Sequence, residues 1–255
     1  MKSLLICLVA FTSLVGLARA DSYSHREPID QTAPFNADGQ LSVSNVNGTV
    51  KVLTWDRNEI RIVGEKKAAS AEELAAIQMK IETLPERARV EVKLPKRKGG
   101  WFGSGNTIRA AVNLTITVPT GSELALVETV NGNVSVENVT GRMKVETVNG
   151  RVSAKGVRGH ASFETVNGSI DAEFQSLAAA AKVEAETVNG GISLRLPADF
   201  AATLDAEVVN GHVECDFPIQ LNGKTSRRQI RGTIGGGGST IDASTVNGSI
   251  KVLKL

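Results

Sequence analysis

Cysteine is almost missing from this chain of 255 residues, which has only Cys7 and Cys215. The stretch 1–20 has a basic start, an apolar run and a small-residue ending at 18–20, the pattern of a secretory signal peptide cleaved before Asp21. Cleavage would leave Cys215 alone, which excludes an internal disulfide. Cys215 has a core-facing phase in an alternating run and is predicted to be a packed, unreactive thiol.

Net charge and long apolar runs are lacking too. The leader holds Lys2 and Arg19 and no acidic residue, so its removal lowers the 29 basic residues to 27, equal to the 27 acidic ones. A chain without basic excess is not expected to bind nucleic acid in general. The apolar run of the leader is too short to span a bilayer, and no later run is long enough, so no transmembrane segment is predicted. We expect an exported protein, either periplasmic or secreted to the cell surface.

What the chain has in quantity is a repeated phrase, Val-Asn-Gly. In residues 127–174 a Val-x-Gly phrase recurs every nine residues and its Asn-bearing form every eighteen. Apolar and polar residues alternate between the phrases, which indicates strands with one buried face. A strand, a Gly turn, a strand and another Gly turn, repeated in register, predict one coil of a β-solenoid. The predicted turn residues are Asn131, Gly132, Asn149, Gly150, Asn167, Gly168, Asn189, Gly190, Asn210, Gly211, Asn247 and Gly248.

Each residue of the phrase has an expected role. Glycine is expected to supply a positive φ at a tight corner. Asparagines on successive coils are expected to stack with their amides hydrogen-bonded in a ladder. Valine is expected to point into the corner of the core.

We therefore predict an all-β fold, a single-stranded β-solenoid of stacked two-strand coils with one short capping α-helix. Residues 21–39 lack periodicity and are predicted to be a leader arm. The domain itself is expected over 40–255, with N-terminal strands and a helix in 40–118 and regular coils in 119–255.

Two local expectations concern the ends of the stack. Ser70 and Glu73 form a capping box ahead of an Ala-rich amphipathic segment, which predicts a helix over 70–82 that covers an open end or flank of the core. The final strand, 249–255, is expected to close the stack.

An acidic row is the first candidate binding surface. Alternation places a threonine column toward the core and glutamates outward, next to one another on successive coils. Like charges stacked one strand apart cost energy unless cations or basic groups intervene. The row could bind a divalent ion or a basic partner, or it could be a solvated face that discourages pairing with other proteins. Its members are Glu128, Glu146, Glu164, Glu186 and Glu207.

A basic loop with aromatics is the second candidate surface. Lys96, Arg97, Lys98 and Trp101 lie between two predicted strands. Interleaved bases and aromatics could contact an anionic polymer or a lipid surface. The alternative is a hairpin tip with a solvated charge run and a tryptophan folded back onto the sheet.

No catalytic constellation is found in the sequence. Its three histidines have no paired Cys or Glu at metal-ligand spacing, and no Gly-rich loop precedes a helix with a Lys. We expect no catalytic residues, no cofactor and no metal site. An enzyme that acts on polysaccharides on a β-helix would need clustered carboxylates that face a basic residue in a groove.

The repeated Glu-Thr-Val-Asn-Gly phrase, the stretch 50–60, the opening 118–121 and the closing stretch 232–250 resemble one bacterial family. It is the "putative adhesin" β-solenoid family of exported proteins, a domain of unknown function allied to head-GIN and toast-rack domains. The resemblance covers about residues 40–255 and implies a bacterial envelope setting without catalytic residues.

The function expected from this resemblance and from the residues is that of a non-enzymatic envelope protein. It would be an adhesin-like or envelope-stress accessory module that binds an unknown envelope polymer or protein, and its oligomeric state is left open. The alternative is a lyase or hydrolase of polysaccharides.

Overall fold

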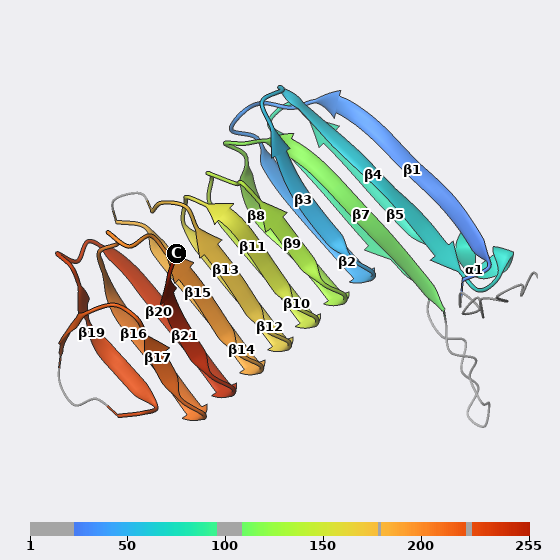
Figure 1. Ribbon diagram of the computed structural model, residues 1–255. Coiled ribbons are helices and arrows are strands. Elements are labelled where there is room, and N and C mark those ends of the chain that lie inside the picture. The colour runs from blue at the N-terminus through green and yellow to red at the C-terminus, as the bar shows by residue number, and fades with distance from the viewer. Residues whose placement is uncertain (1–22, 96–108, 178–179, 223–225) are drawn as a thin grey trace, which may run out of the picture.

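The structure is a computed structural model that describes residues 23–95, 109–177, 180–222 and 226–255. Over these residues the chain forms two long sheets around one shared apolar core (Figure 1). Ten strands make sheet A, in spatial order β1 (His25–Pro34), β4 (Glu59–Ala68), β7 (Ala110–Pro119), β3 (Val50–Trp55), β9 (Val134–Glu137), β11 (Val152–Val157), β13 (Ile170–Phe174), β15 (Ile192–Leu196), β21 (Ile250–Lys254) and β17 (Val213–Cys215). Eleven strands make sheet B, in spatial order β18 (Ile219–Leu221), β19 (Gln229–Ile234), β16 (Ala202–Asn210), β20 (Ser239–Asn247), β14 (Lys182–Asn189), β12 (Ala161–Asn167), β10 (Met143–Asn149), β8 (Glu123–Asn131), β2 (Gln40–Asn47), β6 (Arg87–Lys93) and β5 (Gln78–Leu84). The all-β prediction is confirmed.

In the repeat region, from β8 to β15, consecutive strands alternate between the two sheets. Each strand pairs in parallel with the equivalent strand of the next repeat, as β10 does with β8 and β12. Matching residues face each other across these pairs: Thr147 lies opposite Thr129 and Thr165. Figure 1 shows the resulting row of parallel arrows. The eighteen-residue period therefore becomes an in-register stack of two-strand repeats.

The helix is shorter than the sequence predicts. α1 spans Ala71–Ala75, and the Ser70 side chain accepts a hydrogen bond of 3.1 Å from the Glu73 N–H, as the capping box requires. The rest of the predicted helix is strand β5, antiparallel to β6, because alternation from Gln78 to Leu84 places Met79 and Ile81 against the core. None of the residues of α1 is buried. No helix in the described parts of the chain has the length and apolarity needed to cross a bilayer.

The N-terminal end of the stack is antiparallel. Of the expected leader arm, residues 25–34 form β1, which pairs antiparallel with β4 along its whole length. Phe35, directly after β1, is 1% exposed in the core. The apolar residues of this stretch are few, so its pairing depends on the edge that β4 offers rather than on a pattern of its own.

The C-terminal end departs from the expected order. The last two strands, β20 and β21, lie between the preceding repeats: β20 pairs with β14 and β16, and β21 with β15 and β17. The prediction that the final strand closes the stack is wrong. The antiparallel strands β19 and β18 form the end of sheet B instead. The half-buried Cys215 packs against the core there, and burial raises the pKa of its thiol.

Asparagine side chains bind the repeats together along one edge. In each step the Nδ2 amide of one residue donates to the Oδ1 of the next, at 2.8–2.9 Å. The predicted ladder is confirmed, and it extends one member further, to Asn47. In spatial order it runs through Asn47, Asn131, Asn149, Asn167, Asn189, Asn247 and Asn210.

The residues around each asparagine take opposite faces. The preceding threonines point inward: Thr147, for example, is 4% exposed and its hydroxyl donates to the Gly132 carbonyl at 3.0 Å. The valines between them and the asparagines point outward, so the prediction that they fill the core is wrong at these turns. It is right at the alternate turns, where Val139 and Val157 are fully buried.

Glycine serves close stacking rather than a positive φ at most of these turns. Only Gly48 and Gly211 of the Val-Asn-Gly glycines have a left-handed φ. At Gly168 an added Cβ would lie well under 3.0 Å from the carbonyl oxygen of Gly150, the matching glycine of the neighbouring repeat. The expectation of a positive φ is therefore wrong for most of these turns, where the missing Cβ lets one backbone lie directly against the next.

Gly168→Ala is expected to lower the free energy of unfolding by about 3 kcal/mol or more, because a methyl group cannot enter backbone contact without displacing it. Urea denaturation measures the loss. Gly236→Ala is the matched control, since an added Cβ at Gly236 meets nothing within 4 Å. Equal stability of the two variants would contradict the close-stacking role.

Asn167→Ala is expected to cost about 1–2 kcal/mol of unfolding free energy, because Asn167 both donates to Asn149 and accepts from Asn189. Asn210→Ala should cost about half as much, since among the described residues the side chain of this terminal member has one ladder bond, its donation to Asn247. Thermal and urea unfolding of both variants would test the difference. A larger cost at Asn210 would argue against a ladder of additive bonds.

Candidate binding face

The outer face of sheet B carries the acidic row that the sequence predicts. Glu146 lies opposite Glu128 on one side and Glu164 on the other, and Glu164 lies opposite Glu186. The insertion of β20 then places Ser244 between Glu186 and Glu207. Four consecutive glutamates are thus adjacent, and the fifth is one strand further away.

Lysine partly neutralises this row. Lys144 Nζ lies 2.7 Å from the Glu146 carboxylate on the same strand. The hydrogen bond and charge of Glu146, together with the charges of Glu164 and Glu128, raise the pKa of Lys144 above its ordinary value. One lysine therefore serves three carboxylates, and the row keeps a negative excess.

A second group of acids lies beside the row. Asp242 is opposite both Glu184 and Asp205. Lys182 pairs with Glu184, and Arg231 pairs with Asp205 at 2.6 Å. Two cations here face three carboxylates, so this group keeps a smaller negative excess than the acidic row.

A column of exposed valines runs parallel to the acidic row. Each valine follows by two residues a glutamate of the row, or Ser244 in the case of Val246, so the two side chains share the outer face. These apolar side chains are 37–54% exposed. A shallow hollow of about 230 Å³ lies along the first repeats, with Glu128, Glu146 and Glu164 and their valines in its lining. The valine column consists of Val130, Val148, Val166, Val188, Val246 and Val209.

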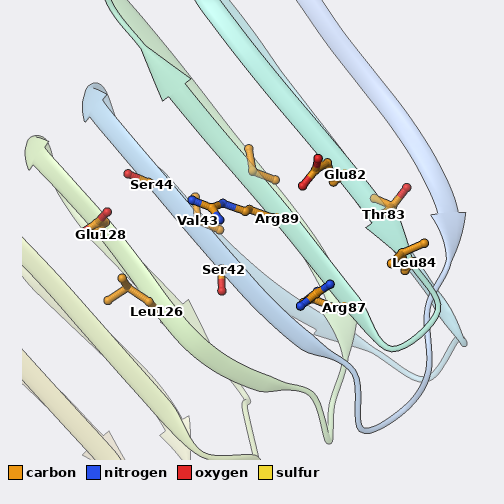
Figure 2. Close-up of a pocket in the computed structure, with 11 residues that line it drawn as sticks. Ser42, Val43, Ser44, Glu82, Thr83, Leu84, Arg87, Arg89, Leu126 and Glu128 are labelled. Atoms are coloured by element: carbon orange, nitrogen blue, oxygen red, sulfur yellow. The ribbon is translucent and has the colours of Figure 1, made fainter.

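A larger hollow, of about 760 Å³, lies at the N-terminal end of the same face. Figure 2 shows Arg87 and Arg89 from β6 with Glu82 and Leu84 from β5 around it. The wall toward the repeats includes Glu128, the first member of the acidic row. The two features are therefore continuous.

Sequence reasoning missed this arginine hollow. Arg87 and Arg89 alternate with the buried Ala88 and Val90, a signal that they share an outer face. Nothing in the sequence shows that β6 lies beside β2, which the chain order separates from it by three other strands. The second candidate surface, the basic loop of Lys96, Arg97, Lys98 and Trp101, lies outside the described residues.

Two observations bear on the chemistry that this face can perform. Within the described ranges, no group of three His, Cys, Asp or Glu side chains is placed to hold a metal ion. In the arginine hollow, a hydrogen bond from Lys80 and nearby positive charges lower the pKa of Glu82. A carboxyl whose pKa is lowered is a poorer general acid near neutral pH.

Comparisons with known proteins agree with the fold. The family model described as Toastrack DUF4097 matches residues 125–253, about half of the chain. No curated protein matches the chain.

Among solved structures, a "putative cell adhesion protein" from Clostridium sporogenes is 14% identical with a TM-score of 0.50, over 90% of this chain and 100% of that one. A "putative lipid binding protein" from Parabacteroides distasonis is 10% identical (TM-score 0.32, 89% and 96%). A "putative adhesin" from Bacteroides fragilis is 12% identical (TM-score 0.29, 89% and 97%). The likeness to the Clostridium sporogenes protein shows that the two chains share a fold.

Glu164→Gln is expected to raise the free energy of unfolding by about 0.2–1 kcal/mol at low salt, because Glu164 lies between Glu146 and Glu186. The gain should shrink as salt screens the repulsion. Glu173→Gln on sheet A is the matched control with the opposite sign, since Glu173 lies opposite Arg195. Urea denaturation at two ionic strengths measures both. A stabilising effect of similar size at Glu173 would contradict the charge explanation.

Proposed function

Because this chain belongs to the Toastrack DUF4097 family, we propose that it is an exported, non-enzymatic, adhesin-like binding protein of the bacterial envelope. The leader of residues 1–20 supports export. The partner is an extended envelope polymer or protein that lies along the outer face of sheet B.

The architecture proposed for this role is a β-solenoid. Its support is the alternation of consecutive strands between two sheets and their in-register parallel stacking. Stacked repeats present equivalent side chains at the inter-strand spacing of about 4.7–4.9 Å. Such a surface fits partners that are themselves extended.

The observation that carries the proposal is the pairing of the acidic row with the valine column. Exposed apolar side chains in a continuous column are unusual on a solvated sheet face and are typical of interaction sites. The neighbouring carboxylates keep a negative excess with Lys144 as their near cation. A partner with basic groups beside apolar ones is complementary to both features.

The arginine hollow supports an alternative function, the cleavage of polysaccharides. It brings Arg87 and Arg89 together with Glu82 and Glu128, and a basic residue facing carboxylates in a groove is what polysaccharide cleavage would need. The lowered pKa of Glu82 weighs against a role as general acid. A cleavage screen with acidic polysaccharides would decide this alternative.

The test of the proposal is binding of residues 21–255, which contain every described element, to intact cells and isolated envelope fractions. The variant Glu146→Gln, Glu164→Gln, Glu186→Gln removes three charges from the acidic row without changing side-chain size. We expect its affinity to fall by about tenfold or more, because each lost charge pairing at an interface costs a fraction of a kcal/mol to a few kcal/mol.

The matched control changes three outward glutamates of sheet A: Glu137→Gln, Glu173→Gln and Glu214→Gln. Its net charge equals that of the first variant, so only the location of the change differs. Saturable binding that survives in the control and weakens in the first variant supports the face. Absence of binding by the unchanged chain, or equal loss in both variants, would overturn the assignment.

A further inference from the structure

The four edge strands of the two sheets differ in how well they are protected. An unpaired edge presents free N–H and C=O groups to other chains, and proteins usually shorten or block it. β17 and β18 have three residues each. β1 is long but contains Pro28 and Pro34, which have no N–H to offer.

β5 has neither protection. It is seven residues long, contains no proline, and among the described residues pairs only with β6. The apolar side chains on its inner face, Met79 and Ile81, are only partly buried although they pack against the core. Leu84 at its end is 48% exposed. The core of the molecule is therefore incompletely covered along this edge.

We propose that β5 is a self-association edge, through which two copies of the chain pair antiparallel about a two-fold axis at Ile81. In this register Lys80 of each copy lies opposite Glu82 of the other, and Met79 lies opposite Thr83. The two sheets B become one continuous sheet across the axis. The proposal concerns the end of the stack and does not depend on the proposed binding face.

Charge complementarity selects this partner and this register. Lys80 and Glu82 flank Ile81 on the outer face, and within one chain they form an exposed ion pair of 2.6 Å. Antiparallel self-pairing at Ile81 adds two cross-strand Lys–Glu contacts, so four charges alternate around the axis. A shift of two residues along the strand removes both contacts and places Lys80 opposite Lys80, or Glu82 opposite Glu82, of the other copy. The charges that would repel an unrelated edge thus favour a second copy.

A single pair of short strands buries less surface than a standard stable interface. We therefore expect a concentration-dependent dimer with a dissociation constant in about the micromolar range or weaker. Sedimentation velocity of residues 21–255 over a concentration series measures it.

The decisive variants are Lys80→Glu and Glu82→Lys. Each alone turns both cross-strand contacts into like-charge pairs and should weaken dimerisation by about tenfold or more. An equimolar mixture of the two should form a heterodimer of near wild-type affinity, because both acidic side chains of the first variant then face lysines of the second. The intrachain ion pair is absent from both variants, so recovery on mixing reports only the contact between chains.

Lys182→Glu and Glu184→Lys provide the matched control. They break the same kind of Lys-x-Glu ion pair on the interior strand β14, and should leave the dimerisation constant unchanged. Unfolding curves of all variants verify that they are folded. A wild-type chain that is monomeric at every concentration would overturn the proposal. So would a dimer that the β5 variants leave intact, or a mixture that stays monomeric.

Discussion

The close approach of one backbone to the next at the Asn-Gly turns is the constraint on which the rest of this molecule depends. At Gly132, Gly150, Gly168, Gly190 and Gly248 there is no room for a Cβ against the matching glycine of the neighbouring repeat. The asparagine amides beside them bond from repeat to repeat. A repeat that slipped by one residue would lose both features and would turn its apolar face outward. The turns therefore fix the register of both sheets.

A fixed register also determines what the surface looks like. When equal positions stack, a glutamate comes to lie beside a glutamate and a valine beside a valine along the repeats of sheet B. The inward positions gain from this, because threonine hydroxyls reach glycine carbonyls in successive repeats. At the outward positions the glutamates repel one another, and the positive charge of Lys144 reduces this repulsion in part. We connect this charged and apolar track with binding because stacked like charges are expected to oppose folding and because its valines stay exposed.

Sequence reasoning reached the repeat and its faces but not the order of the strands. Alternation placed Thr147 inward and Glu146 outward correctly, and the same alternation places Val148 outward, although a corner valine was expected in the core. The predicted helix over 70–82 includes Met79 and Ile81, which belong to strand β5. In so short a segment, helical spacing and strand alternation of apolar residues cannot be told apart. The position of β20 between β14 and β16 depends on pairings across 58 and 37 residues, which no local pattern contains. The arginine hollow was missed for the same reason.

The intercalated C-terminal strands explain how the two ends of the stack come to differ. Because β20 and β21 fill a place between earlier repeats, the C-terminal end is made of β16, β17 and the short antiparallel strands β19 and β18. A backbone hydrogen bond also attaches Leu255 to an interior strand, since its N–H donates to the Leu196 carbonyl of β15 at 2.9 Å. At the N-terminal end β7 lies between the earlier strands β4 and β3 of sheet A, but sheet B stops at β5 with a full-length edge. The other three edges are short or carry prolines. Self-association at β5 about a two-fold axis therefore uses up the one long unprotected edge of each described chain and would produce a dimer and not a fibre.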